Sequence, residues 1–289
     1  MKSGFVNIFG KPNAGKSTLL NALLGEKLAI VSSKVQTTRH RIKAFLTKKE
    51  EYQIIFSDTP GIIEPKYKLH QKMMSGVKSA LEDADVALLL VDVKDNFEEI
   101  SAIFSSLKLK VPAIILLNKT DAASADTIKV AEDFFTQQTY CTKLIKISAL
   151  KEKNLDELLK AIVELLPEGE PFYSEDELTD LPTKFFVGEL IREKIYQLLS
   201  DEIPYHAAVN VNEFTEREDI IKIQADIIVQ RESQKAIILG ERGTMIKKLG
   251  ILAREDIEKF LDKKIYLQLF VKVRPKWRDN DLHLKEYGY

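Results

Sequence analysis

Cysteine is almost absent from this sequence, which contains only Cys141 among 289 residues. A single cysteine excludes a disulfide framework and a cysteine-rich zinc site. Long hydrophobic runs are also missing, since the longest, residues 86–91, has the length of a strand, whereas a membrane-spanning helix needs roughly 20 residues. The first residues suit a strand, and we expect no signal peptide there. We therefore expect a soluble, cytoplasmic protein.

Charge of one sign is not in excess over the whole chain, whose net charge is −1. The distribution is uneven, however. Residues 167–181 carry six acids and no base, whereas residues 231–278 carry 13 bases and six acids. Hydrophobic residues make up 45% of the chain, enough for one large or two ordinary domains, which excludes disorder as the main state. The basic block lies in the second half and is hidden by the total.

Short apolar runs alternate with helical periods up to about residue 167. We expect strands over residues 5–9, 42–46, 52–56, 86–91, 113–117 and 144–147. Apolar spacings of three and four predict helices over residues 17–24, 69–81, 97–107, 126–137 and 155–166. Near-continuous apolar strands separated by helices predict an α/β domain, with a mostly parallel sheet and helices on both faces.

The pattern changes after residue 182. Residues 168–182 are acidic and, with Pro167, hold three of the nine prolines, which predicts a linker between domains at 1–167 and 183–289. The second domain should then begin with a helix over residues 184–199, followed by strands over 208–214 and 220–228. A short helix over 234–239, a long helix that ends near residue 261 and a strand over 265–273 should complete it. The order α-β-β-α-α-β predicts a compact α+β domain.

The first motif is Gly10-Lys11-Pro12-Asn13-Ala14-Gly15-Lys16-Ser17, which fits the phosphate-loop pattern G-x-x-x-x-G-K-[ST]. It stands between a predicted strand and a predicted helix, as that loop requires. Backbone N–H groups and the helix N-terminus would bind the β-phosphate. Lys16 would reach the β- and γ-phosphate oxygens, and the Ser17 hydroxyl would ligate Mg²⁺. A glycine-rich turn that only packs is the alternative, which this context disfavours.

A second motif, Asp58-Thr59-Pro60-Gly61, closes the predicted strand over residues 52–56. Its carboxylate can meet Mg²⁺ through water, and its glycine can sense the γ-phosphate. Alone, Asp-x-x-Gly is also a common turn. Behind a phosphate loop, the pattern indicates a nucleotide site.

The base would be recognised by Asn118-Lys119-Thr120-Asp121, directly after a predicted strand. The Asp121 carboxylate can accept two hydrogen bonds from guanine N1–H and N2–H₂, and adenine lacks that arrangement of donors. The Lys119 stem can lie over the base. A backbone N–H within Ser148-Ala149-Leu150 can reach guanine O6. The sequence therefore predicts a guanine-nucleotide site.

The segment Gln36-Thr37-Thr38-Arg39 lies in a polar stretch before the second predicted strand. A threonine hydroxyl there can complete the Mg²⁺ shell when a γ-phosphate holds the loop in place. Read alone, the two threonines are explained equally well as β-forming residues.

Together these motifs resemble the translation-factor-related GTPases, in the branch that contains Era, Der and the tRNA-modifying protein MnmE. The resemblance implies that Thr38 is the Mg²⁺-contacting threonine of switch I and that Asn13 holds a K⁺ ion against the phosphates. Ile62 stands where Ras-like proteins carry a water-orienting glutamine. An alkyl group cannot orient water, so slow hydrolysis is expected, dependent on the cation, a partner or both.

The resemblance also assigns the site residues. Lys16, Thr38, Asp58 and Gly61 would act in hydrolysis. Mg²⁺ would be bound by Ser17 and Thr38 and, through water, by Asp58. The expected nucleotide contacts are Gly10, Lys11, Pro12, Asn13, Ala14, Gly15, Lys16, Ser17, Thr18, Asp58, Thr59, Pro60, Gly61, Asn118, Lys119, Asp121, Ser148, Ala149 and Leu150.

The second domain contains Gly240-Glu241-Arg242-Gly243 between two predicted helices. Gly-x-x-Gly allows a nucleic-acid strand to approach the backbone, with Arg242 at the phosphates. Glycine also ends ordinary helices, so the turn alone is weak evidence. Within the order α-β-β-α-α-β and a basic block, it predicts a KH domain. Expected RNA contacts are Ile238, Gly240, Arg242, Gly243, Ile246, Lys247, Lys276, Trp277 and Arg278.

Two residues of this domain leave alternatives open. Trp277, the only tryptophan, could stack on RNA or cap the domain core. Glu241 stands where the Era members of the branch named above commonly have a basic residue. A carboxylate beside phosphate should weaken RNA binding or make it more sensitive to salt.

One GTPase domain followed by one KH domain with its Gly-x-x-Gly turn resembles the Era family over nearly the whole chain. The resemblance implies a GTPase that binds the 3′ end of small-subunit (16S-type) rRNA and assists assembly of the small (30S-type) subunit. We expect a monomer. Its expected ligands are GTP or GDP, Mg²⁺ and K⁺. The alternatives are an RNA-binding module with a largely structural nucleotide site, and a cell-cycle GTPase in peripheral contact with the inner membrane.

Overall fold

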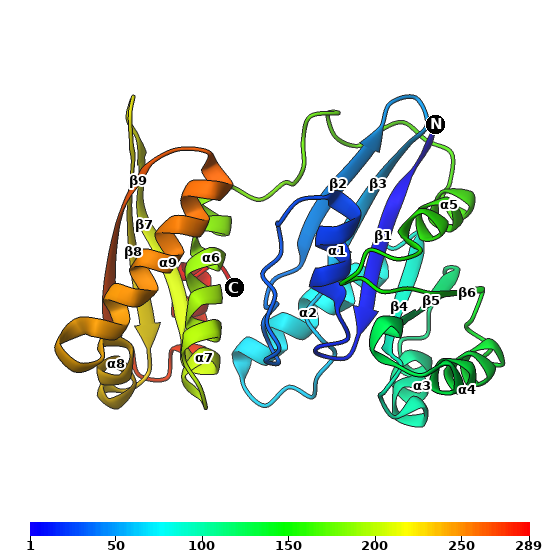
Figure 1. The fold of residues 1–289 in the computed structure, drawn as a ribbon, viewed down its shortest axis with the longest axis horizontal. Helices are drawn as coiled ribbons and strands as arrows, with labels where there is room; N and C mark the ends of the chain where they lie inside the picture. The colour runs from blue at the N-terminus through cyan, green and yellow to red at the C-terminus, as the bar shows by residue number, and fades with distance from the viewer. The chain divides into compact units, whose positions relative to one another are not determined.

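A computed structural model describes residues 1–289, and the chain forms two compact units (Figure 1). The first comprises residues 1–29, 38–64 and 73–180. The second comprises residues 30–37, 65–72 and 181–289. Two short segments from the first half of the chain therefore belong to the second unit. None of the helices has both the length and the apolar composition needed to cross a membrane.

The first unit is built on a six-stranded sheet in the order β2-β3-β1-β4-β5-β6, in which only β2 is antiparallel to its neighbour. The strands are β1 (Lys2–Gly10), β2 (Ile42–Lys48), β3 (Tyr52–Asp58), β4 (Val86–Asp92), β5 (Ala113–Asn118) and β6 (Lys143–Lys146). The helices are α1 (Lys16–Leu24), α2 (Lys68–Glu82), α3 (Phe97–Ser106), α4 (Ala125–Thr136) and α5 (Leu155–Leu165), with a 3₁₀ turn η1 (Thr120–Ala122). This confirms the predicted α/β class.

The central strands explain why this sequence folds as a parallel sheet. Every residue of β5 is buried, and so are the first six residues of β4. Strands covered on both faces need apolar residues at consecutive positions. Because β1, β3, β4 and β5 run in the same direction, Gly10, Asp58, Asp92 and Asn118 end their strands at one edge of the sheet. The loops that carry the three predicted motifs therefore meet there.

The second unit has a three-stranded sheet in the order β7-β8-β9, in which β8 is antiparallel to β7 and parallel to β9. Its strands are β7 (Ala208–Glu216), β8 (Ile221–Val229) and β9 (Ile265–Val273). Its helices are α6 (Thr183–Leu198), α7 (Ile203–His206), α8 (Glu232–Leu239), α9 (Thr244–Leu261) and α10 (Asp281–Glu286), with 3₁₀ turns η2 (Glu241–Gly243) and η3 (Trp277–Asp279). Apolar residues of α6, α8 and α9 and of the sheet share one core.

The predicted order α-β-β-α-α-β is confirmed, with additions that the sequence did not indicate. Helix α7 has four residues and α10 has six, and elements of this length are too short to show a period of 3.6 residues. Helix α10 begins at a cap rather than at an apolar period, since the Asn280 side chain accepts hydrogen bonds from the N–H groups of Leu282 and His283.

The segment predicted as a linker, residues 168–182, is mostly part of the first unit, and the units divide between Asp180 and Leu181. Its aromatic residues provide the attachment. Tyr173 stacks on Phe45 with ring centroids 3.7 Å apart. Phe172 lies edge-on to Phe5 at 5.1 Å, and its N–H donates to Gln53 Oε1 at 2.6 Å. The acids and prolines of this segment indicated a linker, but two ring contacts hold it in place.

Candidate nucleotide site and nucleic-acid groove

The phosphate loop is connected to the rest of the site through Asn118. Helix α1 begins at Lys16, and Gly15 before it has φ 102°, a backbone conformation that favours glycine. A Cβ on Gly15 would also lie 2.4 Å from Asn118 Nδ2. That amide donates to the Ala14 carbonyl at 2.8 Å, while Asn118 Oδ1 accepts from the Ala149 N–H at 3.0 Å. Asn118 therefore joins the phosphate loop to the loop after β6.

Lys16 is buried, although it carries a charge. Its ammonium group donates to the carbonyl oxygens of Gly10 and Lys11 at 3.1 and 2.9 Å. Burial lowers the pKa of Lys16 to about 8, and the nearby Asp58 carboxylate opposes this shift. A bound anion would favour the charged form of this side chain.

Three oxygen-bearing side chains meet beside Lys16. Ser17 Oγ lies 2.8 Å from Thr38 Oγ1, and it donates to Asp58 Oδ2 at 2.5 Å. Thr38 Oγ1 donates to the same carboxylate oxygen at 3.2 Å. Burial raises the pKa of Asp58, whereas Lys16 and the two hydroxyl groups lower it. Thr38 lies outside β2, which begins at Ile42, so it does not act as a strand residue.

The other oxygen of Asp58, Oδ1, is buried without a hydrogen-bond partner. A buried acceptor left unsatisfied is costly. Hydroxyl and carboxylate oxygens are the ligands that Mg²⁺ prefers, usually together with substrate phosphates and water. The residues at this corner therefore fit a magnesium ion.

The segment after Asp58 lies against the phosphate loop. Thr59 Oγ1 donates to the Ile8 carbonyl at 2.7 Å, and Pro60 is buried. A Cβ on Gly61 would lie 2.7 Å from the Pro12 ring. The N–H of Ile62 donates to the Gly10 carbonyl at 3.4 Å, and its side chain packs on the apolar core. Ile62 therefore has a place in the packing of the first unit.

Asp121 supplies the carboxylate of the motif that is predicted to recognise the base. Ser148 Oγ donates to Asp121 Oδ1 at 2.6 Å, and this bond is the main cause of the lowered pKa of Asp121. Lys119 has φ 62°, and its ammonium group pairs with Asp92 Oδ2 at 2.7 Å. Because the Ala149 N–H is taken by Asn118, the exposed Leu150 offers the next N–H of this loop. The hydrogen bond from Ser148 thus favours the ionised form of Asp121, which is the form that accepts hydrogen bonds.

Three further residues predicted to contact the nucleotide lie in or directly after the phosphate loop: Lys11, Asn13 and Thr18. Lys11 pairs with Glu99 at 2.8 Å. Asn13 is exposed with φ 65°, and Thr18 is half-buried in the first turn of α1.

In the second unit, the predicted Gly-x-x-Gly turn connects α8 to α9. Gly240 and Gly243 have φ 71° and 79°, so both occupy the left-handed region that favours glycine. Between them, Glu241 and Arg242 are exposed. Helix α9 begins directly after Gly243, and its first N–H groups therefore lie beside the turn.

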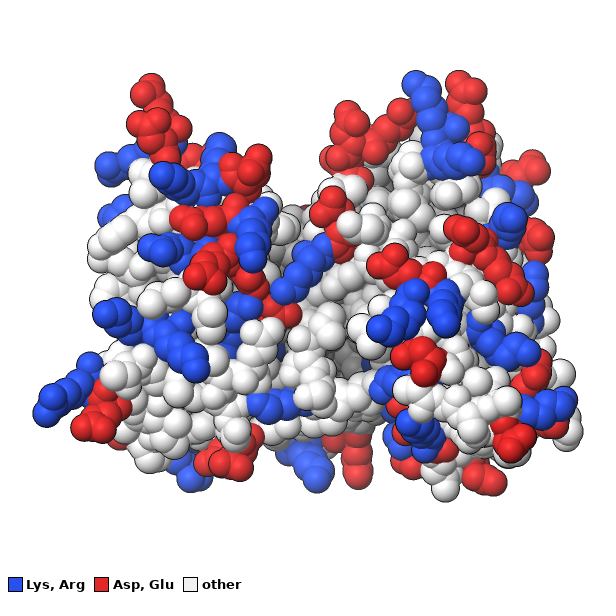
Figure 2. Space-filling view, in the orientation of Figure 1, with Lys and Arg blue, Asp and Glu red and all other residues white.

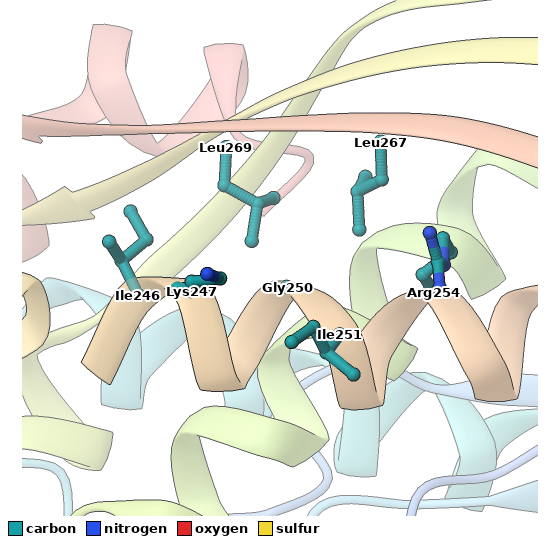
Figure 3. A pocket seen from close by; sticks show the side chains of 7 residues that line it. All are labelled: Ile246, Lys247, Gly250, Ile251, Arg254, Leu267 and Leu269. Carbon is teal, nitrogen blue, oxygen red and sulfur yellow. The ribbon is translucent and has the colours of Figure 1, made fainter. Parts of the chain in front are cut away.

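A groove of about 340 Å³ lies between α9 and β9 (Figure 3). Leu267 and Leu269 point from β9 toward the helix, which passes the groove at Gly250. The lining residues are Ile246, Lys247, Gly250, Ile251, Arg254, Leu267 and Leu269. The groove combines an apolar floor with two basic side chains, Lys247 and Arg254. This combination suits the unstacked nucleobases and the phosphate backbone of a single strand. On the face of the molecule that Figure 2 shows, basic and acidic residues are interspersed.

The structure brings only some of the predicted RNA contacts to this groove. Ile246 and Lys247 line it, and the Gly240–Gly243 turn stands at the start of the same helix. Ile238 is fully buried in the core. Sequence reasoning missed Arg254 and the two leucines. A helical spacing of seven residues from Lys247 to Arg254 was an available signal, but the leucines come from a strand that only the fold brings close.

Three predicted RNA contacts lie near the C-terminus, and two of them, Trp277 and Arg278, contact other residues of the protein. Trp277 is 0% exposed, and its Nε1–H donates to the His206 carbonyl at 2.9 Å, so it has the core-capping place and presents no ring face to RNA. The Arg278 guanidinium lies over the Tyr67 ring at 4.2 Å. Lys276 is exposed with φ 56°.

Two family models match the chain. Residues 5–119 match a family described as a 50S ribosome-binding GTPase, and residues 202–278 match the KH domain family. Among curated relatives, the GTPase Era of Ruminiclostridium cellulolyticum is 44% identical over the whole chain and 97% of its own length. The GTPase Era of Clostridium kluyveri is 43% identical over the whole chain and 99% of its own length.

Two solved structures are similar over the full chain. A single-residue variant of Aquifex aeolicus Era bound to GDP·AlF4⁻ has a TM-score of 0.96 and 41% identity, and the match covers 100% of this chain and 99% of the other. Era in complex with MgGDPNP and nucleotides 1506–1542 of 16S ribosomal RNA has a TM-score of 0.94, with the same identity and coverage.

Proposed function

This chain belongs to the Era family of GTPases, and on that premise we propose that it couples GTP hydrolysis to binding of the 3′ end of small-subunit rRNA. It would act as an assembly factor of the small ribosomal subunit. Residues 1–167 would form the GTPase domain and residues 183–289 the KH domain. The observation that carries the proposal is a guanine-nucleotide site and a KH groove in one chain.

In the nucleotide site, this chain's own residues orient and neutralise the phosphates. Lys16 would exchange its two carbonyl partners for β- and γ-phosphate oxygens, and the N–H groups at the start of α1 would face the β-phosphate. Asp121, kept ionised by Ser148, would accept from guanine N1–H and N2–H₂. The Leu150 N–H would donate to guanine O6. These contacts select guanine because adenine leaves a carboxylate without its donors.

Magnesium is the expected metal. Ser17 and Thr38 would supply hydroxyl ligands, and Asp58 would act through water. When bound, the ion neutralises charge on the β- and γ-phosphate oxygens. The relative crystallised with MgGDPNP supports this assignment, as does the unpartnered Asp58 Oδ1.

We propose that intrinsic turnover is slow and stimulated by K⁺. Ile62 packs on the core and has no group that could orient the attacking water. Asn13 lies exposed on the phosphate loop and carries a side-chain oxygen, which suits the monovalent cation of this branch. The cation would then supply positive charge where other GTPases use an arginine.

The α9–β9 groove would bind single-stranded RNA. Ile246, Leu267 and Leu269 offer an apolar floor to unstacked bases, while Lys247 and Arg254 can meet phosphates. A KH fold takes about four nucleotides in this way. The Era relative that was crystallised with 16S nucleotides 1506–1542 supports the choice of RNA.

The test is GTP turnover in K⁺ and in Na⁺ buffer, with and without an RNA oligomer that copies the small-subunit rRNA 3′ end. We expect faster turnover in K⁺ and a further increase with this RNA but not with a scrambled one. Asn13→Ala should remove the difference between K⁺ and Na⁺ while GDP binding persists. If neither ion nor RNA changed a near-zero rate, the chain would instead be an RNA-binding module with a structural nucleotide site.

We further propose that the protein is a monomer in the cytoplasm, where small subunits assemble. Peripheral contact with the inner membrane is the alternative. Sedimentation with anionic lipid vesicles, with and without the RNA oligomer as competitor, separates the two.

A further inference from the structure

The ends of β4 and β5 lie side by side in the first unit, directly before the residues of the base motif. The two strands are parallel, and their register pairs Asp92 with Asn118. The Val93 N–H donates to the Asn118 carbonyl at 3.3 Å, so the contact between the strands continues one residue beyond β4. Lys119, the next residue of the base motif, therefore starts beside Asp92, a residue that belongs to none of the predicted motifs.

The Asp92 carboxylate is held by two contacts of different kinds. Its Oδ1 accepts from the Lys94 N–H at 3.0 Å, a side-chain to backbone bond of the Asx-turn type. Its Oδ2 pairs with the Lys119 ammonium group at 2.7 Å. The Asp92 side chain is only 17% exposed, so this charge is screened less than a surface charge. The backbone therefore fixes one oxygen of the carboxylate, and the other oxygen meets the lysine.

Lys119 needs such an anchor because its side chain is long and partly exposed. Its backbone has φ 62°, a conformation that residues other than glycine adopt infrequently. A lysine stem has many rotamers and loses much conformational freedom when it is fixed. An ammonium group paired at 2.7 Å leaves the stem fewer positions. Part of the ordering cost is then met before a nucleotide binds.

The connection from β4 to α3 reaches the phosphate loop as well. Glu99, in the first turn of α3, pairs with Lys11 at 2.8 Å, and both side chains are more exposed than that of Asp92. Asp95 lies between the two pairs. Its own burial and the Asp92 charge raise the pKa of Asp95, whereas Lys11 and Lys119 lower it. The Glu99 pair is more screened and therefore weaker, so Asp92 makes the stronger of the two contacts.

We infer that Asp92 is a positioning residue that holds the Lys119 stem over the guanine ring. This inference rests on the proposed guanine-nucleotide site and deepens it, because it names a residue outside the motifs on which a motif residue depends. Asp92 itself touches no nucleotide and acts through Lys119. The contact of an alkyl stem with a purine face is apolar and independent of the ring substituents, whereas Asp121 would accept from N1–H and N2–H₂. Asp92 therefore contributes to affinity and Asp121 to base selection.

The test uses the full-length protein with two variants, their combination and a matched control. Asp92→Asn keeps the size of the side chain and an oxygen for the Lys94 N–H, but it removes the charge that holds Lys119. Lys119→Met keeps an apolar stem without the ammonium group. The control, Asp133→Asn, breaks a lysine pair of nearly the same length on α4, in which Lys129 Nζ lies 2.6 Å from Asp133 Oδ1.

Three measurements are made on each protein. Melting temperatures show whether it is folded. Calorimetry gives its affinities for GDP, GDPNP and inosine diphosphate, whose base lacks the N2 amino group that guanine offers to Asp121. Turnover of GTP gives kcat and KM. Should Asp92→Asn melt well below the wild type, Asp92→Ser replaces it, because a hydroxyl oxygen can still accept from the Lys94 N–H.

We expect Asp92→Asn to weaken all three nucleotides by the same factor, about fivefold, as for one lost charged hydrogen bond that is partly exposed. KM for GTP should rise about as much while kcat stays unchanged, because the stem contact is the same in the ground state and the transition state. In the Lys119→Met background, Asp92→Asn should have no further effect. Asp133→Asn should keep wild-type values.

A merely structural role of Asp92 has a different signature. A distorted loop after β5 would also displace Asp121, and the ratio of GDP affinity to inosine diphosphate affinity would then fall. A fall in that ratio, additive losses in the double variant, or a folded Asp92→Asn with wild-type affinities would each overturn the inference.

The wild-type protein separates this inference from the proposed function. If the wild type bound GDP but failed to hydrolyse GTP or to respond to RNA, the proposed function would fail. Binding of GDP needs neither hydrolysis nor RNA, so the GDP affinities of the four proteins in the cycle would still decide whether Asp92 positions Lys119.

Discussion

The phosphate loop and the KH turn both place a left-handed glycine before a helix, yet their surroundings differ. Gly15 precedes α1 with φ 102°, and a Cβ there would meet Asn118 at 2.4 Å. Gly243 precedes α9 with φ 79°, and a Cβ there would meet nothing within 4 Å. The first glycine is enclosed by a buried, hydrogen-bonded site, while the second stands in the open. An enclosed site selects its ligand by geometry and by single buried charges, whereas an open one depends on screened charges and apolar area.

Substituting the two glycines gives the largest expected contrast. Gly15→Ala forces Asn118 away from the Ala14 and Ala149 backbone groups and adds strain, and we expect GTP affinity to fall about a thousandfold. Gly243→Ala carries only the cost of its positive φ, and RNA affinity should fall about fivefold. Calorimetry with GTP and fluorescence anisotropy with the RNA oligomer measure both. Equal losses at the two sites would contradict the comparison.

Base selection by one carboxylate gives the next largest effect. Asp121→Asn replaces an acceptor-only group with an amide, and GTP affinity should fall about a hundredfold because guanine N1–H and N2–H₂ lose their shared acceptor. Xanthosine triphosphate carries a carbonyl in place of the amino group, so its affinity should rise. Competition between the two triphosphates on the wild type and the variant checks this. Unchanged preference would remove Asp121 from base recognition.

Salt should separate the two sites at moderate magnitude. If Arg242, Lys247 and Arg254 each meet one phosphate, RNA affinity should fall about twentyfold between about 50 and 200 mM salt. Lys247→Ala should reduce the slope of log affinity against log salt by about 0.7. The buried nucleotide contacts are less screened, and GDP affinity should respond less. A flat RNA titration would show that the groove binds through its apolar floor alone.

The smallest effect is on pH dependence. The pKa of Lys16 is lowered to about 8, and phosphate binding favours the protonated form. The affinity contributed by this charge is therefore present below that pKa and is lost as the pH rises through it. GTP affinity should fall about fourfold from about pH 7 to about pH 8.5. Lys16→Arg, whose guanidinium remains charged, serves as the control and should not show this decrease.

Much of the fold could be predicted because its signals are local. The central strands β4 and β5 are buried along nearly their whole length, so their apolar runs were unambiguous. The segment 168–182 was misleading because acids and prolines dominate its composition, while Phe172 and Tyr173 attach it to the first unit. Helices α7 and α10 are too short to carry a periodic signal.

The sequence by itself indicated the nucleotide site, because the residues expected to contact one chemical group of the ligand are close together in the chain. Lys16 and Ser17 follow each other, and Asp121 lies three residues after Asn118. Neighbours in the sequence are held together by covalent geometry, whatever the rest of the fold does.

Only the tertiary structure decided the surroundings of the nucleotide site and of the groove in the second unit. Asn118 ties Ala14 to Ala149, Trp277 is enclosed in the core, and two leucines of β9 complete the groove on α9. Arg192 reaches the Thr37 carbonyl across 155 positions of the chain. Such contacts depend on burial and on the packing of whole elements, and no spacing in the sequence encodes which distant backbone group a buried charge will meet.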